Sequence, residues 1–125
     1  MKRINTSKAP SAIGPYSQAF VAGDFMFTSG QGGINPENGK VVEGGIEAQT
    51  EQTMKNLNAL FNEAGADFTK AVKTTCFLAN MSDFTAFNAV YAKYFTEKPP
   101  RTCVAVKELS LGILCEVEVV LYLGK

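Results

Sequence analysis

The strongest constraint on the fold is a segment near the C-terminus, from Leu114 to Val120, whose pattern continues to Leu123. Apolar side chains recur at every second position, the spacing that places them on one face of a β-strand. This apolar row consists of Cys115, Val117, Val119, Leu121 and Leu123. The opposite face carries Glu116 and Glu118 among apolar neighbours. The strand therefore presents one face for a core and another with two carboxylates.

A second strand is predicted over residues 99–106, which begin with two prolines. Side chains two residues apart point the same way in a strand, so Arg101, Cys103 and Ala105 share a face. A guanidinium, a thiol and the Glu116 carboxylate can meet if the two strands, or copies of them on neighbouring subunits, come together. We take these groups as the candidate site.

Length and charge limit the classes of function. The 125 residues fit one domain, residues 1–125, with a single core. The 12 Lys and Arg residues balance the 12 Asp and Glu residues without a basic run, which argues against nucleic-acid binding. No apolar run approaches the roughly 20 residues of a membrane helix, and no apolar region follows Met1-Lys2-Arg3 as in a signal peptide. We expect a cytoplasmic protein with no nucleic-acid or membrane partner.

The absence of histidine removes the usual general base and the commonest metal ligand. The three cysteines, Cys76, Cys103 and Cys115, lie far apart in the sequence and have no C-x-x-C spacing. We expect free thiols instead of a disulfide framework or a zinc site. An enzyme built from this chain would use Arg, Glu, Tyr, Ser, Cys and backbone groups, with no metal and no cofactor.

The remaining elements follow from changes in hydrophobic period. In chain order we expect strands at 2–5, 18–22 and 25–30, a helix at 45–64, a strand at 71–78, a helix from Ser82 or Asp83 that Lys98-Pro99-Pro100 stops, and the two strands described above. This order indicates an α+β domain with two helices, which can cover only one face of the sheet.

Large apolar side chains on the strands exceed what one covered face needs. They are Phe25, Phe27, Phe77, Val120 and Tyr122. A soluble monomer would expose many of them as an apolar patch. We therefore expect the uncovered sheet face to pack against other copies of the chain in an obligate oligomer.

Three segments each allow a structural and a functional interpretation. Tyr16 follows Pro15 and either packs its ring on the edge of the core or faces a ligand. The glycines of Ser29-Gly30-Gln31-Gly32-Gly33 let a ligand approach the backbone closely, although a mobile turn is the simpler expectation. Asn88 lies within an aromatic helix face, where a buried amide needs partners. Its simpler interpretation is a bond to backbone in its own subunit.

Five separated motifs are similar, in this order, to those of one known family. They are Ala12-Ile13-Gly14-Pro15-Tyr16, Thr28-Ser29-Gly30-Gln31, Phe84-x-x-Phe87-Asn88-x-x-Tyr91, Pro100-Arg101-x-Cys103-Val104 and Cys115-Glu116-Val117-Glu118. With them the chain resembles, over essentially its whole length, the Rid family (reactive intermediate deaminases, or YjgF-type proteins). The resemblance is closest to the RidA branch, which has the arginine and the glutamate.

The resemblance implies a chorismate-mutase-like fold of the bacillar type and a homotrimer with a central barrel and clefts between subunits. It also implies hydrolysis of enamine or imine intermediates, such as 2-aminoacrylate and 2-iminobutanoate, to 2-oxo acids and ammonia. The implied catalytic residues are Arg101 and Glu116. The implied lining residues are Tyr16, Ser29, Gly30, Asn88 and Cys103, the last largely through its backbone.

The chemistry of these residue types suits such a substrate. Arg101 offers a planar, bidentate partner for the carboxylate of a 2-imino acid. Glu116 can orient or deprotonate the attacking water, or pass protons to the leaving ammonia. Two alternatives remain open. In the first, Arg101 and Glu116 form a structural ion pair at a subunit junction. Cys103, two residues from Arg101, also fits a reactive thiolate.

Another class of function competes with the deaminase. A trimer that binds small carboxylates or partner proteins in the same clefts without turnover would need Arg101 but not Glu116. A ribonuclease or translation inhibitor, roles assigned to some relatives, gains little support from a chain with zero net charge and no histidine.

Overall fold

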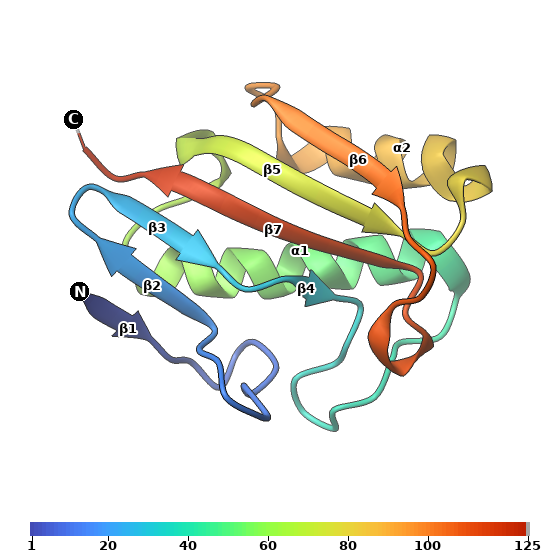
Figure 1. Ribbon diagram of the computed structural model, residues 1–125, viewed down its shortest axis with the longest axis horizontal. Coiled ribbons are helices and arrows are strands. Elements are labelled where there is room, and N and C mark those ends of the chain that lie inside the picture. Colours follow the sequence, from blue (N-terminus) through green and yellow to red (C-terminus); the bar gives the residue numbers. More distant parts are fainter. Residues whose placement is uncertain (125) are drawn as a thin grey trace.

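The computed structural model describes residues 1–124, which form one mixed sheet and two α-helices (Figure 1). The elements are β1 (Lys2–Ile4), β2 (Ala19–Ala22), β3 (Phe25–Thr28), β4 (Gln31–Gly32), α1 (Gly45–Glu63), β5 (Ala71–Leu78), α2 (Phe84–Tyr94), β6 (Arg101–Ala105) and β7 (Cys115–Tyr122). The predicted α+β class with two helices is confirmed. No helix within residues 1–124 combines the length and apolarity needed to cross a membrane.

The strand order in the sheet is β1-β2-β3-β7-β5-β6, and β4 pairs with β7 beyond the end of β3. Only the β5–β6 pair is parallel; the other named pairs are antiparallel. The C-terminal strand β7 therefore lies inside the sheet, with β3 and β4 along one side and β5 along the other. This central place explains its unbroken apolar row, because β7 lies inside the sheet and packs against α1.

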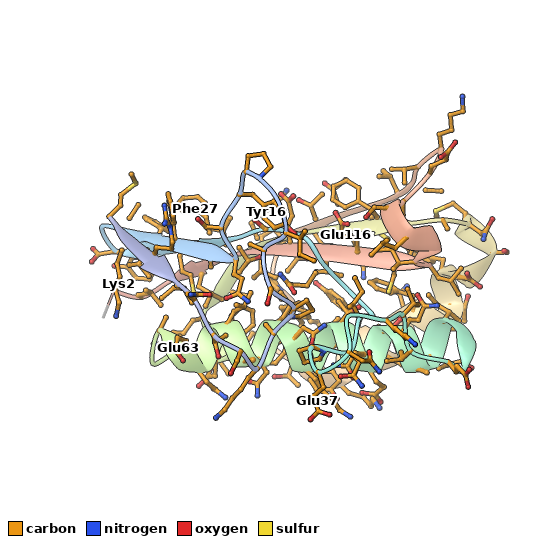
Figure 2. All side chains as sticks on the ribbon, turned by 90° about the horizontal axis from the view of Figure 1, so that it is seen from below. Lys2, Tyr16, Phe27, Glu37, Glu63 and Glu116 are labelled. Atoms are coloured by element: carbon orange, nitrogen blue, oxygen red, sulfur yellow. The ribbon has the colours of Figure 1, made fainter. Side chains whose placement is uncertain are left out.

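Both helices lie on one face of the sheet (Figures 1 and 2). Against them, the side chains of Cys115, Val117, Val119 and Leu121 are at most 2% exposed, as their alternation predicts. From α1, Met54, Leu57, Leu60 and Phe61 are fully buried against the same face. The core thus lies between one sheet face and two helices.

The other face of the sheet is uncovered and carries an aromatic cluster. Phe25, Phe27 and Tyr122 are 40%, 48% and 37% exposed, and their rings pack on one another. Phe27 and Tyr122 come from neighbouring strands, β3 and β7, that pair directly. The sequence prediction of an apolar sheet face without a helical cover is confirmed.

The helix α2 ends at Tyr94, four residues before the predicted stop at Lys98. Phe95 leaves the helical path (φ −90°, ψ 66°) and stacks on Tyr91, with 4.5 Å between ring centres. Its side chain is only 2% exposed. Burial of this ring, and not the Pro99-Pro100 pair, therefore sets the end of the helix. At the other end Asp83 is the N-cap residue but makes no side-chain cap hydrogen bond.

The glycine-rich segment after β3 is a buried strand instead of the mobile turn that the sequence favours. In β4, Gln31 pairs with Val117 and Gly32 with Glu116. The next residue, Gly33, packs against α1 so closely that a Cβ there would lie 2.7 Å from the Cα of Gln49. The glycines are needed here for close packing between the strand, the helix and β7.

Candidate active site

Arg101 is the first residue of β6, at the edge of the sheet. Its register partner on β5 is Thr74, and both side chains point to the face covered by α2. There the Nη1 group of Arg101 donates a hydrogen bond to Oδ1 of Asn88 (2.7 Å). The guanidinium carbon also lies 4.8 Å from the ring centre of Tyr91 and 5.6 Å from that of Phe84. The half-buried guanidinium is thus held at one N–H and over aromatic faces.

Asn88 does not bind backbone, contrary to its simpler sequence interpretation; its amide oxygen binds the Arg101 side chain. The helix explains this arrangement, since residues 88 and 91 lie one turn apart on the same face of α2. Beside them a cavity of about 270 Å³ opens between α2 and the segment from Lys98 to Arg101. The guanidinium therefore faces a space large enough for a small ligand.

Cys103 lies beside Arg101 on the same strand face and opposite Cys76 of β5. Burial raises the pKa of the Cys103 thiol above its ordinary value, and the nearby Arg101 guanidinium lowers it by a smaller amount. This direction of the pKa shift disfavours the alternative in which Arg101 makes Cys103 a reactive thiolate. A half-buried thiol fits the lining role that the resemblance implies.

Tyr16, Ser29, Gly30 and Glu116 line one cavity of about 680 Å³ on the other side of the molecule. Figure 2 shows Tyr16 and Glu116 on the side away from α1. A Cβ at Gly30 would overlap the Glu116 carboxylate, so a glycine is required for the carboxylate to occupy this place. Burial, and then the neighbouring Glu118 charge, raise the pKa of Glu116 above the ordinary value of a glutamate.

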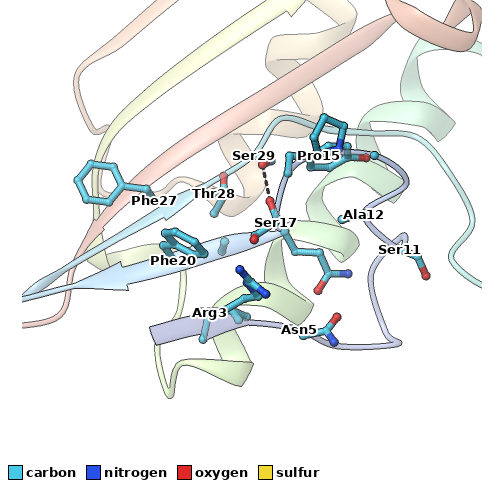
Figure 3. Close-up of a pocket in the computed structure, with 15 residues that line it drawn as sticks. Arg3, Asn5, Ser11, Ala12, Pro15, Ser17, Phe20, Phe27, Thr28 and Ser29 are labelled. Carbon is cyan, nitrogen blue, oxygen red and sulfur yellow. Dashed lines mark hydrogen bonds between the residues drawn. The ribbon is translucent and has the colours of Figure 1, made fainter. Parts of the chain in front are cut away.

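Two hydrogen bonds fix the loop that carries Tyr16. The Ser29 hydroxyl donates to the backbone carbonyl of Ser17 (2.6 Å), and the Tyr16 hydroxyl accepts from the backbone N–H of Ile13 (3.3 Å). Tyr16 is 53% exposed, so its ring does not pack into the core. A second cavity, of about 870 Å³, adjoins this loop along β1 and β2 and contains Arg3 (Figure 3).

The two implied catalytic residues point to opposite faces of the sheet in one chain. Arg101 is in register with Thr74 of β5, and Glu116 with Phe77 of the same strand. Residues three apart in a strand point to opposite faces. The only ion pair within residues 1–124 joins Lys93 and Glu51, so Arg101 and Glu116 form none within the chain. The candidate residues therefore form two separate groups, which we call the arginine half-site (Arg101, Asn88, Cys103) and the glutamate half-site (Tyr16, Ser29, Gly30, Glu116).

Tyr91 and Leu111 were not among the implied site residues. Tyr91 stands in the same family motif as Asn88, but its place on the aromatic helix face indicates a core residue, so it was not assigned to the site. Leu111 lines the Glu116 cavity with its side chain 71% exposed and its backbone at a positive φ of 58°, which no sequence signal indicates. Within residues 1–124 no group of three His, Cys, Asp or Glu side chains is placed to hold a metal ion.

A family model described as Endoribonuclease L-PSP matches residues 6–123 of the chain. Human 2-iminobutanoate/2-iminopropanoate deaminase is 42% identical over 122 residues, which cover 97% of this chain and 89% of the human protein. The chain belongs to the Rid family. This confirms the resemblance read from the five motifs.

Solved structures of similar proteins share the fold. RidA from the Antarctic bacterium Psychrobacter sp. is 38% identical with a TM-score of 0.93, and the match covers 98% of this Rid chain and 99% of that one. E. coli TdcF with bound serine is 33% identical with a TM-score of 0.92, over 98% of each chain. The two-helix, mixed-sheet architecture is therefore that of known Rid structures.

Proposed function

We propose that this Rid protein is a deaminase that hydrolyses small 2-imino acids, such as 2-iminobutanoate and the imine form of 2-aminoacrylate, to 2-oxo acids and ammonia. The observation that carries the proposal is the Arg101 guanidinium, held by Asn88 and aromatic rings beside a cavity. A guanidinium has five N–H donors, and one of those of Arg101 donates to the side-chain oxygen of Asn88. The remaining donors can bind a carboxylate bidentately. The name of the human relative supports the same substrate class.

The reaction needs one water and one proton-transfer group. With the substrate carboxylate on Arg101, a water adds to the carbon of the protonated C=N bond while the Glu116 carboxylate takes a proton from that water. Glu116 returns this proton to the nitrogen of the resulting carbinolamine. The carboxylate then takes the hydroxyl proton as the C–N bond breaks and the C=O bond forms, and it passes that proton to the leaving ammonia, which departs as ammonium. A pKa of Glu116 raised by burial suits such an exchange, because the group takes up and releases its proton closer to neutral pH.

The complete site is proposed to form between two copies of the chain. In a homotrimer with a central barrel, the arginine half-site of one subunit would face the glutamate half-site of the next. Two observations support this assembly: the open sheet face is aromatic, and the sheet ends in two free edges, β1 and β6. Without a second copy, Arg101 and Glu116 remain on opposite faces.

The test is 2-oxo acid formation from an imine that a threonine dehydratase generates in the same assay. Wild type should accelerate it, Arg101→Ala should not, and Glu116→Gln should lose about 10²–10⁴-fold of the acceleration. Glu63→Gln, an exposed change at the end of α1, is the matched control and should keep wild-type activity. Wild type without any acceleration would contradict the proposal.

A carboxylate-binding protein without turnover is the second candidate, and the serine-bound structure of the E. coli TdcF relative favours it. Calorimetric titration with 2-oxobutanoate separates the two. If the deaminase proposal is right, Glu116→Gln binds the 2-oxo acid but does not accelerate hydrolysis. If wild type binds the acid through Arg101 and accelerates nothing, the second candidate is the correct one.

A further inference from the structure

Tyr91 lines the cavity beside Arg101 and contacts the guanidinium that is proposed to bind the substrate carboxylate. The Arg101 guanidinium carbon lies 4.8 Å from the centre of its ring, nearer than to Phe84 at 5.6 Å. A cation over an aromatic face within about 6 Å is attracted by the ring, and more strongly where water is excluded. Tyr91 is 7% exposed, so this contact lies mostly out of solvent.

The Tyr91 ring is itself held in place from several directions. Its hydroxyl is hydrogen-bonded to the fully buried hydroxyl of Thr74 on β5 (2.7 Å). Phe95 stacks on its ring at 4.5 Å and 26°, and Phe87 packs at 5.7 Å. Burial raises the pKa of the Tyr91 hydroxyl, so it stays neutral and keeps this hydrogen bond. The ring is therefore a rigid surface that joins α2 to β5.

Arg101 needs such a surface because it begins an edge strand and has a long, flexible side chain. Asn88 fixes one N–H of the guanidinium, which leaves rotation of the plane about that bond. A ring packed against one face of the guanidinium prevents this rotation. The N–H groups that do not bind Asn88 then remain free for a carboxylate. Bidentate binding requires the fork and the carboxylate to share a plane.

We propose that Tyr91 is a positioning residue: its ring sets the plane of the Arg101 guanidinium and so determines carboxylate affinity. This inference rests on the proposed function, since it assigns Arg101 to substrate binding. It also assigns a role to Thr74, which holds the Tyr91 hydroxyl. The effect must appear in KM and in 2-oxo acid affinity, because Tyr91 touches neither the attacking water nor Glu116.

The experiment compares Tyr91→Phe, which keeps the ring, with Tyr91→Leu, which removes it. Tyr91→Leu should raise KM and the Kd for 2-oxobutanoate about tenfold with little change in kcat, whereas Tyr91→Phe should stay within about threefold of wild type. The matched control is Tyr94→Leu, on the same helix: its hydroxyl donates to Glu51, and its ring lies against Phe68. It should lower the melting temperature without a change in KM.

A double-mutant cycle separates positioning from general destabilisation. In an Arg101→Ala background, Tyr91→Leu should cause no further loss of the remaining 2-oxobutanoate affinity, measured by calorimetric titration. Equal KM values for Tyr91→Leu and wild type would overturn the inference, as would a full additional loss in the Arg101→Ala background. If wild type binds 2-oxobutanoate in a Tyr91-dependent way but does not accelerate hydrolysis, the role of Tyr91 stands and only the deaminase proposal is contradicted. Wild type that neither binds the acid nor turns over would overturn both.

Discussion

At the residue scale, burial affects the pKa of the Cys103 thiol more than the nearest charge does. Its thiol lies beside a guanidinium, yet burial raises its pKa. At about pH 7 we expect iodoacetamide to alkylate Cys103 more slowly than it alkylates glutathione, with the rate rising only above the ordinary thiol pKa of about 8.5. Arg101→Ala should slow the reaction further, because Arg101 lowers the pKa. Peptide mass spectrometry measures the rate, and alkylation faster than that of glutathione would contradict this assignment.

The alternation of side chains was sufficient to predict that Arg101 and Cys103 share a face. It was not sufficient to predict the direction in which the thiol pKa shifts, because this direction depends on how closely α2 packs over β6. The partner of Asn88 was missed for a related reason. An amide on an aromatic helix face needs a partner, but only the register of β6 against β5 brings the Arg101 side chain to it.

At the scale of elements, α1 does more than bury a sheet face, because its buried amides hold the segments that carry the site. Asn56, 1% exposed, donates to the backbone carbonyls of Gly32 (3.0 Å) and Ile34 (2.9 Å). Gln49 accepts from the backbone N–H of Leu114 just before β7 (2.8 Å). These bonds fix β4 and the start of β7, the two strands that bring Gly30 and Glu116 together.

Asn56→Ala should therefore lower the free energy of unfolding by about 1–3 kcal/mol, because it removes both hydrogen bonds that the buried amide donates; the Gly32 carbonyl keeps the Ile34 N–H as a donor, whereas the Ile34 carbonyl loses its side-chain donor. Asn62→Ala, an exposed change on the same helix, is the control and should stay within about 0.5 kcal/mol of wild type. Urea unfolding followed by circular dichroism gives both values. Equal stability of the two variants would show that the Asn56 bonds do not hold β4 in solution.

Periodicity predicted the long elements well, since α1 begins at the predicted Gly45 and ends one residue before the predicted Ala64. It failed where tertiary contacts overrule local pattern. β4 has two residues, too few for any period, and forms because β7 offers it hydrogen bonds. The early end of α2 follows from the pocket that buries Phe95, which is built partly by Phe68, far away in the sequence.

For the whole molecule, one chain accounts for the fold but supplies only halves of the proposed site. The sequence indicated an uncovered aromatic face, and the structure confirms it. That Arg101 and Glu116 point to opposite faces was beyond reach of the sequence. Alternation fixes which residues of one strand share a face, but not how two strands align, and here β5 sets the alignment of both β6 and β7.

If each site combines Arg101 of one subunit with Glu116 of the next, two inactive variants should complement each other. Arg101→Ala chains keep Glu116, and Glu116→Gln chains keep Arg101. In trimers assembled at random from equal amounts, about one site in four receives both intact residues, so the mixture should recover about a quarter of wild-type activity. Co-refolding the purified variants, followed by the 2-oxo acid assay, measures the recovered activity.

The control mixes Arg101→Ala with the double variant Arg101→Ala, Glu116→Gln. This mixture has no intact site and should stay inactive. An Arg101→Ala and Glu116→Gln mixture that forms mixed trimers but stays inactive would contradict a site shared between subunits.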